Sequence, residues 1–241
     1  MHSTMTRNIT MSAILLAALC GTAYAGDNNQ ITITQDGFAN SLTVDQSKAS
    51  NSTVGGVSLL NGPLADDASA KLRLNDTAEQ KGTGNTAKLT ITNLTDDENH
   101  LLFDHGQIGL RQDNSLSSAG PNVALVTVNG DGTGLVSQNG GGNTANMLIT
   151  GLGSTGSIYQ NGDGNNIGTQ TLTEHGLKVE GKNASGSITQ NGDGNNTNLA
   201  VFGNGTSVDY TLNGDNITNV PAGGVQVISN GATVTITQTR F

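Results

Sequence analysis

The sequence predicts an all-β protein, a β-solenoid of stacked strand-turn-strand repeats of about 22 residues with irregular insertions. Three observations predict it: a short motif recurs along the chain, apolar and polar residues alternate on both sides of it, and the composition suits no ordinary globular core. The clearest copy is Gly-Ser-Ile-Tyr-Gln-Asn-Gly-Asp-Gly-Asn-Asn at residues 156–166. It returns at residues 186–196 with Thr in place of Tyr.

The centre of this motif is Gln, any residue, Gly, two residues and Asn. It occurs as Gln35/Gly37/Asn40, Gln80/Gly82/Asn85, Gln138/Gly140/Asn143, Gln160/Gly162/Asn165 and Gln190/Gly192/Asn195. Gln138 and Gln160 are 22 residues apart, and a further 22 residues after Gln190 stands Leu212, where Leu-Asn-Gly-Asp repeats the pattern. The step of 30 from Gln160 to Gln190 indicates an insertion of eight residues. The step of 45 from Gln35 to Gln80 predicts two periods, with a degenerate copy at Leu60-Asn61-Gly62. Between Gln80 and Gln138 the spacing is irregular.

The first 25 residues have the layout of a signal peptide. Arg7 precedes the apolar residues 14–19, and Ala23-Tyr24-Ala25 supplies the small residues of a cleavage site. We expect cleavage between Ala25 and Gly26 and secretion through the Sec pathway. A short buried helix is the alternative, and a lipoprotein signal is disfavoured because Leu19 precedes Cys20. Cleavage removes Cys20, the single cysteine, so the mature chain would hold no disulfide.

Composition limits the possible classes. Charged residues make up 12% and aromatic residues 3%, there is no Trp, and Gly occurs 34 times, so a core of large side chains is poorly supplied. Three prolines leave long stretches free to pair as strands. After Gly26, 19 acidic and nine basic residues give a net charge of about −10, which disfavours nucleic acid as a partner. No mature segment approaches the roughly 20 apolar residues of a membrane helix, so we expect no membrane insertion.

The elements follow from the alternation. Residues 31–35 and 40–46 alternate in side-chain character, as do 143–149, 195–201 and 234–238, which predicts strands on both sides of each turn. The turn glycines are predicted at Gly37, Gly82, Gly140, Gly162, Gly192 and Gly214, where dipeptides such as Asn-Gly accept the positive φ of a tight turn. Copies stacked about 4.8 Å apart would bury one continuous narrow core. We expect an N-terminal solenoid part with degenerate repeats over 26–134 and a C-terminal part with clearer repeats over 135–241.

The Gln and Asn side chains gain a role from such stacking. A buried carboxamide without a partner costs roughly 1–3 kcal/mol, whereas one stacked on an identical carboxamide one repeat away both donates and accepts. The residues expected in these self-assembly ladders are Gln35, Asn40, Gln46, Gln80, Asn85, Gln138, Asn143, Gln160, Asn165, Gln190, Asn195 and Gln238. In the alternative interpretation they are solvated residues that flank turns.

These residues resemble the curlin repeat of bacterial curli fibres, Ser-x5-Gln-x4-Asn-x5-Gln, often with Gly two residues after the first Gln. Gln35, Asn40 and Gln46 match its last three positions, and Ser154, Gln160 and Asn165 match its first three. No copy has all four. Asn29 and Ala184 stand at the leading Ser position of the copies around Gln35 and Gln190, and Ile91, Ile149 and Val201 stand where the closing Gln of three copies would be. The resemblance covers residues 30–46 and 135–238. Few residues separate Gly26 from the first repeat, whereas curli subunits usually carry a longer Gly-rich export segment there.

The resemblance implies a secreted structural protein, a self-assembling subunit or accessory of amyloid-like surface fibres for cell adhesion and biofilm matrix. It implies no enzyme and no cofactor. The implied partners are further copies of the chain, other curli subunits and the curli export machinery. The competing class is a soluble extracellular β-helix that binds a polysaccharide or calcium and does not polymerise, and an enzyme ranks third.

Other chemistries have weaker support. Asn-Gly-Asp-Gly-Asn-Asn is similar to calcium-binding nonapeptide repeats, but Asn replaces the essential Asp and the spacing is far longer than nine, so we expect no metal site. The mature histidines are His100, His105 and His175, without a cysteine or a nucleophile motif. We interpret His105 beside Asp104 as a solvated pair and the acidic residues 96–98 as a solvated turn. No catalytic residue is therefore expected.

Overall fold

The computed structural model of the chain describes residues 23–25, 29–59, 72–75, 77–92, 105–168, 176–218 and 224–240. Every regular element in these ranges is a β-strand, which confirms the all-β class. Most of the expected signal peptide (residues 1–22) lies outside the described residues, as do Gly26, the candidate copy at Leu60-Asn61-Gly62, the acidic residues 96–98 and Asp104. No helix among the described residues has the length and apolar character needed to cross a membrane.

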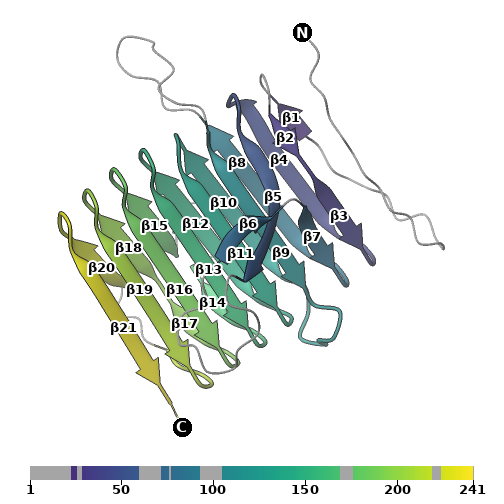
Figure 1. Ribbon diagram of the computed structural model, residues 1–241. Helices are drawn as coiled ribbons and strands as arrows, with labels where there is room; N and C mark the ends of the chain where they lie inside the picture. Colours follow the sequence, from purple (N-terminus) through teal and green to yellow (C-terminus); the bar gives the residue numbers. More distant parts are fainter. Residues whose placement is uncertain are drawn as a thin grey trace.

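The strands form two large sheets (Figure 1). Sheet A is ten-stranded, and its order from edge to edge is β1 (Ala23–Ala25), β4 (Ser41–Lys48), β8 (Thr86–Thr92), β10 (Val123–Asn129), β12 (Thr144–Thr150), β15 (Leu177–Glu180), β18 (Leu199–Phe202) and β20 (Val225–Ile228). The short strands β14 (Asn166–Ile167) and β17 (Asn196–Thr197) extend it beside β12.

Sheet B is eleven-stranded. Its order is β2 (Gln30–Ile31), β5 (Thr53–Leu59), β9 (Gln107–Asp113), β11 (Thr133–Asn139), β13 (Thr155–Asn161), β16 (Ser185–Asn191), β19 (Ser207–Asn213) and β21 (Thr233–Thr239), joined by β3 (Ile33–Asp36), β6 (Leu72–Asn75) and β7 (Ala78–Lys81).

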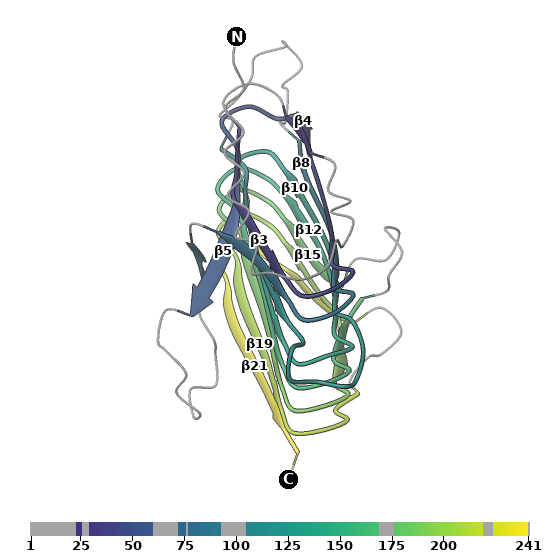
Figure 2. The ribbon, with the colours of Figure 1, turned by 90° about the vertical axis from the view of Figure 1, so that its right-hand side faces the viewer.

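The chain alternates between the two sheets and so forms coils. In each coil a strand of sheet B leads through one turn, here named the glycine turn, into a strand of sheet A, and a return turn leads to the next coil. Neighbouring coils pair in parallel, and the two sheets face each other as separate layers, a β-solenoid-like arrangement (Figure 2). The boundary expected between residues 134 and 135 falls inside β11, which pairs on both sides.

The insertion between the twin motifs does not break the stack. All seven residues of β13 pair in register with those of β16, from Thr155↔Ser185 to Asn161↔Asn191. On the other sheet, the amide of Gly176 donates to the carbonyl of Asn146 at 3.1 Å and its carbonyl accepts from Leu199 at 2.7 Å. Gly176 thus takes the place in the coil that follows Ile167, so residues 168–175 are the eight additional residues.

The second coil of sheet B is built from two segments. The start of β5 pairs with β2 and β9, and β7 pairs with β3 and β9, so β5 and β7 share one level of the sheet. Gln35 pairs directly with Gln80. The expectation of an intervening repeat in the 45-residue step is therefore wrong.

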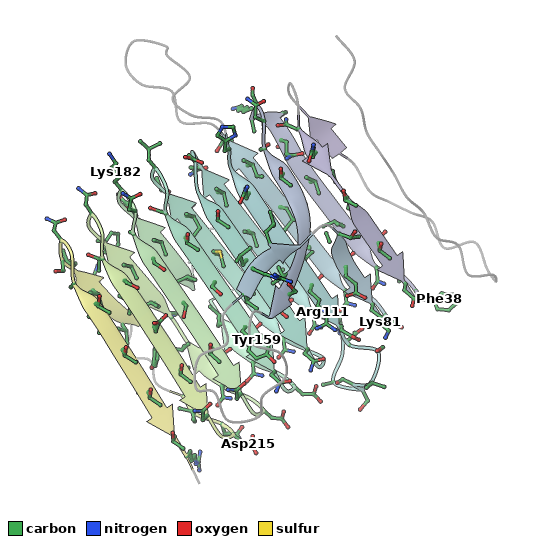
Figure 3. All side chains as sticks on the ribbon, in the orientation of Figure 1. Phe38, Lys81, Arg111, Tyr159, Lys182 and Asp215 are labelled. Atoms are coloured by element: carbon green, nitrogen blue, oxygen red, sulfur yellow. The ribbon has the colours of Figure 1, made fainter. Side chains whose placement is uncertain are left out.

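The later residues of β5 form an antiparallel hairpin with β6, with Gly56 opposite Asn75 and Leu59 opposite Leu72. It lies over the outer face of sheet B near Arg111 and Tyr159 (Figure 3). A small second cluster forms there from Val57, Leu72 and Leu135, with Leu74 and Tyr159 against it. Side-chain alternation did not predict this hairpin.

The main core runs as one apolar cluster between the sheets. Alternate residues of each strand point inward, so Ile158 and Ile188 of sheet B face residues such as Met147 and Ile149 of sheet A. The glycine that opens the twin motif belongs to this packing. A Cβ on Gly156 would lie 2.2 Å from Cδ1 of Ile149, so the large side chain of sheet A occupies the space that glycine leaves.

Candidate functional site

Six glutamines form a continuous ladder along sheet B. The Nε2 of each donates to the Oε1 of the next, always toward the C-terminal end, at distances of 2.6 to 2.9 Å. The members are Gln35, Gln80, Gln112, Gln138, Gln160 and Gln190. All except Gln35 are fully buried. The ladder therefore has a direction, with an acceptor at its first end and a donor at its last.

The second amide proton of these side chains is also used. Gln138 and Gln160 donate it to the carbonyls of Val123 and Thr144 across the glycine turn, each at 3.0 Å. Gln80, Gln112 and Gln190 make the corresponding bonds to Ser41, Thr86 and Asn166 at 3.1 to 3.3 Å. The ladder thus joins neighbouring coils and also ties sheet B to the start of each strand of sheet A.

The ladder is interrupted before its last position. Leu212 stands between Gln190 and Gln238 in register. The hydroxyl of Tyr210, which is 1% exposed, donates to Oε1 of Gln238 at 3.2 Å. Gln238 therefore lies in the predicted column, but its carbonyl is held by a tyrosine and not by an amide.

The asparagines form a column of a different kind from the expected one. Oδ1 of each Asn accepts the backbone N–H of the residue one coil further on, at 2.9 to 3.1 Å, through Asn40, Asn85, Asn122, Asn143, Asn165 and Asn195 to Ile217. Side-chain Nδ2 groups donate to carbonyls of the turns, as Asn143 does to Gly162 at 2.9 Å. The prediction of Asn stacked on Asn is corrected here: the shorter side chain reaches the backbone at the corner instead.

Gln46 does not join the glutamine ladder. It lies on β4 in sheet A, where the neighbouring coils carry aliphatic residues such as Ile91, and its Nε2 donates to Oγ of Ser52 at 2.9 Å. A ladder needs an amide on each neighbouring coil, and sheet A does not supply one at this position. Gln46 therefore stabilises the return turn between β4 and β5 through this hydrogen bond.

The six predicted turn glycines all have positive φ, between 100° and 123°. They are stacked closely as well, because a Cβ on Gly162 would lie 2.3 Å from the carbonyl oxygen of Gly192. Conformation and space both exclude a side chain there. The turns carry Phe38, Lys81 and Asp215 along one rim, while Lys182 lies on the opposite rim with the return turns (Figure 3).

Two residues of the columns were missed from the sequence, Gln112 and Asn122. They are ten positions apart, whereas the motif places Gln and Asn five apart, because the glycine turn after β9 is longer by five residues. The detectable signal was the alternation of Ile108, Leu110 and Gln112 before this turn. A motif search that allowed turns of variable length would have found the pair.

The acidic residues of three glycine turns accept hydrogen bonds from the backbone. Oδ1 of Asp163, Asp193 and Asp215 each accepts a backbone N–H of the preceding coil at 2.7 to 2.8 Å. Within the described ranges, no three His, Cys, Asp or Glu side chains gather as a metal site would require.

Local contacts shift three pKa values. Burial raises the pKa of Asp113, but hydrogen bonds from Ser115 and the charges of Lys81 and Arg111 outweigh it and hold the pKa below its ordinary value. Hydrogen bonds from Ser47 lower the pKa of Asp45. Burial raises the pKa of Tyr159.

Both ends of the stack present unpaired sheet edges within the part of the chain that is described. Sheet B begins at β2 and β3 and finishes at β21, which pairs only with β19. At the last edge, Val234 and Ile236 are only partly buried against the core. Ile31 and Ile33 are partly buried at the first edge. Such edges are templates for a further strand.

Comparison with known proteins confirms the repeat. Residues 26–55, which contain the first glycine turn and the Gln35, Asn40 and Gln46 positions, match the curlin associated repeat. No curated protein and no solved structure shows significant similarity to the chain.

Proposed function

We propose that this chain is a secreted curlin-like structural protein, a self-assembling subunit or accessory of amyloid-like surface fibres that serve adhesion and biofilm matrix. The observation that carries the proposal is the pair of open sheet edges, at each of which the glutamine column reaches the edge strand. The curlin repeat at residues 26–55 supports it. Self-association and contact with other curli subunits follow from the same edges.

The two edges of sheet B fit each other in register. The glutamine column runs from Gln35 through each coil to Gln238. A second copy stacked in the same direction therefore sets Gln238 opposite Gln35, Ile236 opposite Ile33 and Val234 opposite Ile31. The partly buried aliphatic residues of both edges would then join one core. Each Å² of apolar surface removed from water stabilises the contact by roughly 25 cal/mol.

Hydrogen-bonding groups at the two edges are complementary as well. Among the described residues, nothing donates to Oε1 of Gln35, and nothing accepts from Nε2 of Gln238. In the stack, this donor and this acceptor continue the ladder in its own direction. In the same register Thr239 lies opposite Asp36 of the second copy and Arg240 follows one residue later, so opposite charges come close at the corner.

The experiment is incubation of the purified chain from Gly26 onward, followed by thioflavin fluorescence and electron microscopy. We expect fibres and a rise in fluorescence after a lag, and the lag should shorten when preformed fibres are added. A chain that stays monomeric for days would contradict the proposal and favour the soluble β-helix that binds a polysaccharide.

A further inference from the structure

Sheet A is one strand shorter than sheet B at the C-terminal end of the described stack. Sheet B continues through β21, one strand past β20, which is the last strand of sheet A. In the stacking proposed above, β21 meets β2 and β3 of the next copy, and the next strand of sheet A is then β4 of that copy. β20 of one copy and β4 of the next would therefore be two strand spacings apart, about 9–10 Å, and the opening between them has the width of one strand.

The edge of β4 that faces this opening is free in the mature chain. β1 pairs with that edge in the full chain, and the expected cleavage after Ala25 removes β1. The N–H of Ser41 donates to the carbonyl of Asn85 at 2.8 Å, so Ser41 points its peptide groups towards β8. Peptide groups alternate along a strand, so those of Leu42 and Val44 point towards the opening.

The edge of β20 offers the same kind of groups from the other side. The N–H of Val225 donates to the carbonyl of Asn198 at 3.0 Å, so the peptide groups of Val225 point towards β18. Those of Gln226 and Ile228 therefore point towards the opening. Among the described strands, none pairs with β20 on this side. An extended segment in the opening would thus be hydrogen-bonded on both sides, as the inner strands of sheet A are.

The inward side chains around the opening define what such a segment should carry. Leu42 and Val44 are buried on one side of it, and Val225 and Val227 are partly buried against the core on the other. Val44 and Val225 belong to one aliphatic column, which runs through Leu89, Val126, Met147, Leu177 and Leu199. Aliphatic residues at alternate positions of the segment would fill this gap in the core.

Gln46 adds a polar requirement. It is fully buried, and its Nε2 donates to Oγ of Ser52 at 2.9 Å, but its Oε1 has no hydrogen-bond partner among the described residues. In the ladder of sheet B, Oε1 of each Gln accepts from the Gln of the preceding coil. The position that precedes Gln46 in sheet A is the opening itself. A Gln in the bound segment would supply the missing donor.

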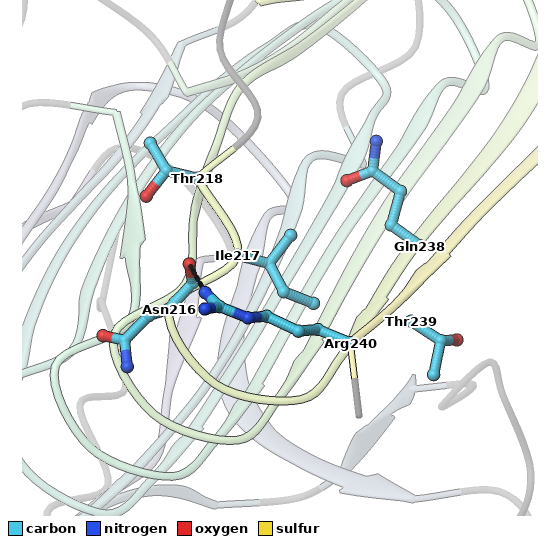
Figure 4. Close-up of a pocket in the computed structure, with 6 residues that line it drawn as sticks. All are labelled: Asn216, Ile217, Thr218, Gln238, Thr239 and Arg240. Carbon is cyan, nitrogen blue, oxygen red and sulfur yellow. Dashed lines mark hydrogen bonds between the residues drawn. The ribbon is translucent and has the colours of Figure 1, made fainter.

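A pocket marks the corner at which the segment would begin. It lies beside β21 between Asn216, Ile217 and Thr218 on one side and Gln238, Thr239 and Arg240 on the other (Figure 4). Arg240 spans it and donates to the carbonyl of Asn216 at 3.2 Å. In the preceding coils the corresponding place is filled by the chain as it turns from sheet B into sheet A.

From these observations we propose that each junction between copies binds an extended segment of a second protein in sheet A. The segment runs parallel to β4 and carries two aliphatic residues and a Gln at alternate positions, opposite Leu42, Val44 and Gln46. This inference rests on the proposed stacking of copies and names a partner for the stacked fibre. Because every junction has the opening, the segment would bind once per chain along the fibre and not only at the fibre ends.

A labelled peptide with the sequence of residues 233–239, Thr-Val-Thr-Ile-Thr-Gln-Thr, tests the opening because it has this pattern and no charged side chain. It is added, at concentrations at which it stays monomeric, to fibres of the chain that begins at Gly26, and its co-sedimentation with the fibres is measured. We expect saturation near one peptide per chain. The same peptide with Leu in place of Gln should bind at least about tenfold more weakly, because Oε1 of Gln46 then lacks its donor.

Two variants of the fibre-forming chain locate the site. Gln46→Leu should abolish the preference for the Gln peptide over the Leu peptide. Gln226→Leu changes an exposed side chain on β20 and should leave this preference unchanged. If Gln46→Leu does not assemble, the two peptides on fibres of the original chain still decide the question.

The outcomes separate this inference from the proposed function. Saturation far below one peptide per chain, or equal binding of the two peptides to fibres of the original chain, would overturn the inference and leave the stacking intact. Absence of fibres would contradict the proposed function itself, and the opening with it.

Discussion

At the residue scale, the glutamine ladder is the part of the fold with the strictest chemical demand. The four buried amides of Gln80, Gln112, Gln138 and Gln160 each have both protons and the carbonyl engaged, one proton along the stack and one across the turn. Removing one member leaves a donor on one neighbour and an acceptor on the other without a partner. The cost is then set by two buried groups and not by one hydrogen bond.

Gln138→Leu tests this demand. The substitution leaves Nε2 of Gln112 and Oε1 of Gln160 without their ladder partner. We expect the free energy of unfolding, measured with urea, to fall by about 2–4 kcal/mol. The matched control is Gln226→Leu, an exposed Gln on β20, with an expected change within about 0.5 kcal/mol. Similar losses in both variants would show that the ladder adds no stability.

The glycine turns allow a comparison inside one motif. Gly162 has φ of 123° and no space for a Cβ, whereas Gly164 has φ of 67° and no atom within 4 Å of a Cβ. We expect Gly164→Ala to cost about 1–2 kcal/mol, the usual penalty of a left-handed residue, and Gly162→Ala to cost clearly more. Thermal unfolding of both variants measures this, and an equal shift of the melting temperature would contradict the stacked turn.

Asp113 gives the fold a pH dependence. Its folded pKa lies below the unfolded value of about 3.9, so its ionised form adds stability above that pH, and this contribution is lost as the pH falls through the folded pKa. Ser115→Ala removes a hydrogen bond of 2.6 Å to this carboxylate, and we expect it to destabilise the chain at pH 6 and less at pH 3, where the carboxylate begins to take up its proton.

Urea unfolding at the two pH values checks the effect. Ser117→Ala serves as the control, since it removes a hydroxyl that accepts from the amide of Ala119 and touches no carboxylate. Its effect should be the same at both pH values. A pH-independent loss for Ser115→Ala would rule out the charge on Asp113 as the cause.

At the element scale, sequence periodicity was sufficient for the strands and turns but not for their connections. Alternation and the Gln-x-Gly spacing placed Gln35, Gln80, Gln138, Gln160 and Gln190 in one column, because a period of two fixes which side chains face inward. It could not place Gln112, whose turn is longer. It also misplaced Gln46, because inward phase alone does not say what stands on the neighbouring coil.

Side-chain alternation did not predict the β5–β6 hairpin, for a related reason. Its apolar residues, such as Val57 and Leu72, pack on the outer face of sheet B, where alternation predicts solvent. Alternation shows which side chains face the core and which face away from it. It does not show whether another segment packs on the side chains that face away. The asparagine column was misjudged because one side-chain methylene decides whether an amide reaches its neighbour or the backbone.

The insertion after β14 provides a test of the coil geometry. Deleting residues 168–175 joins Ile167 directly to Gly176 and Leu177. This segment then has the same length as Thr197-Asn198-Leu199 on the next coil. We therefore expect the variant to fold with an unchanged far-UV circular dichroism spectrum and a similar urea midpoint. Deleting 168–176 also removes Gly176, which bonds to both Asn146 and Leu199, and should be clearly destabilising. Equal stability of the two deletions would mean that Gly176 is not part of the coil.

At the scale of the whole molecule, sheet B keeps one register from Gln35 to Gln238, and the strands at its two ends each have one unpaired edge among the described residues. The amide of Arg240 and the carbonyl of Ala232 form hydrogen bonds with β19. The N–H and C=O groups of the even-numbered residues in β21 therefore point towards β19. Since peptide groups alternate along a strand, those of Thr235 and Thr237 face the open edge. This edge is where a second copy would pair, and it can be closed without altering the bonds to β19.

Elongation of fibres by the variant Thr237→Pro tests the central claim most directly. Proline removes an N–H from the open edge and blocks a further strand, while Thr237→Val keeps the N–H and the strand preference. With preformed fibres as seeds, thioflavin fluorescence should show elongation by Thr237→Val at close to the original rate and a loss of at least about tenfold for Thr237→Pro, which corresponds to about 1.4 kcal/mol, with equal circular dichroism for both. Equal elongation by the two variants would contradict stacking through this edge.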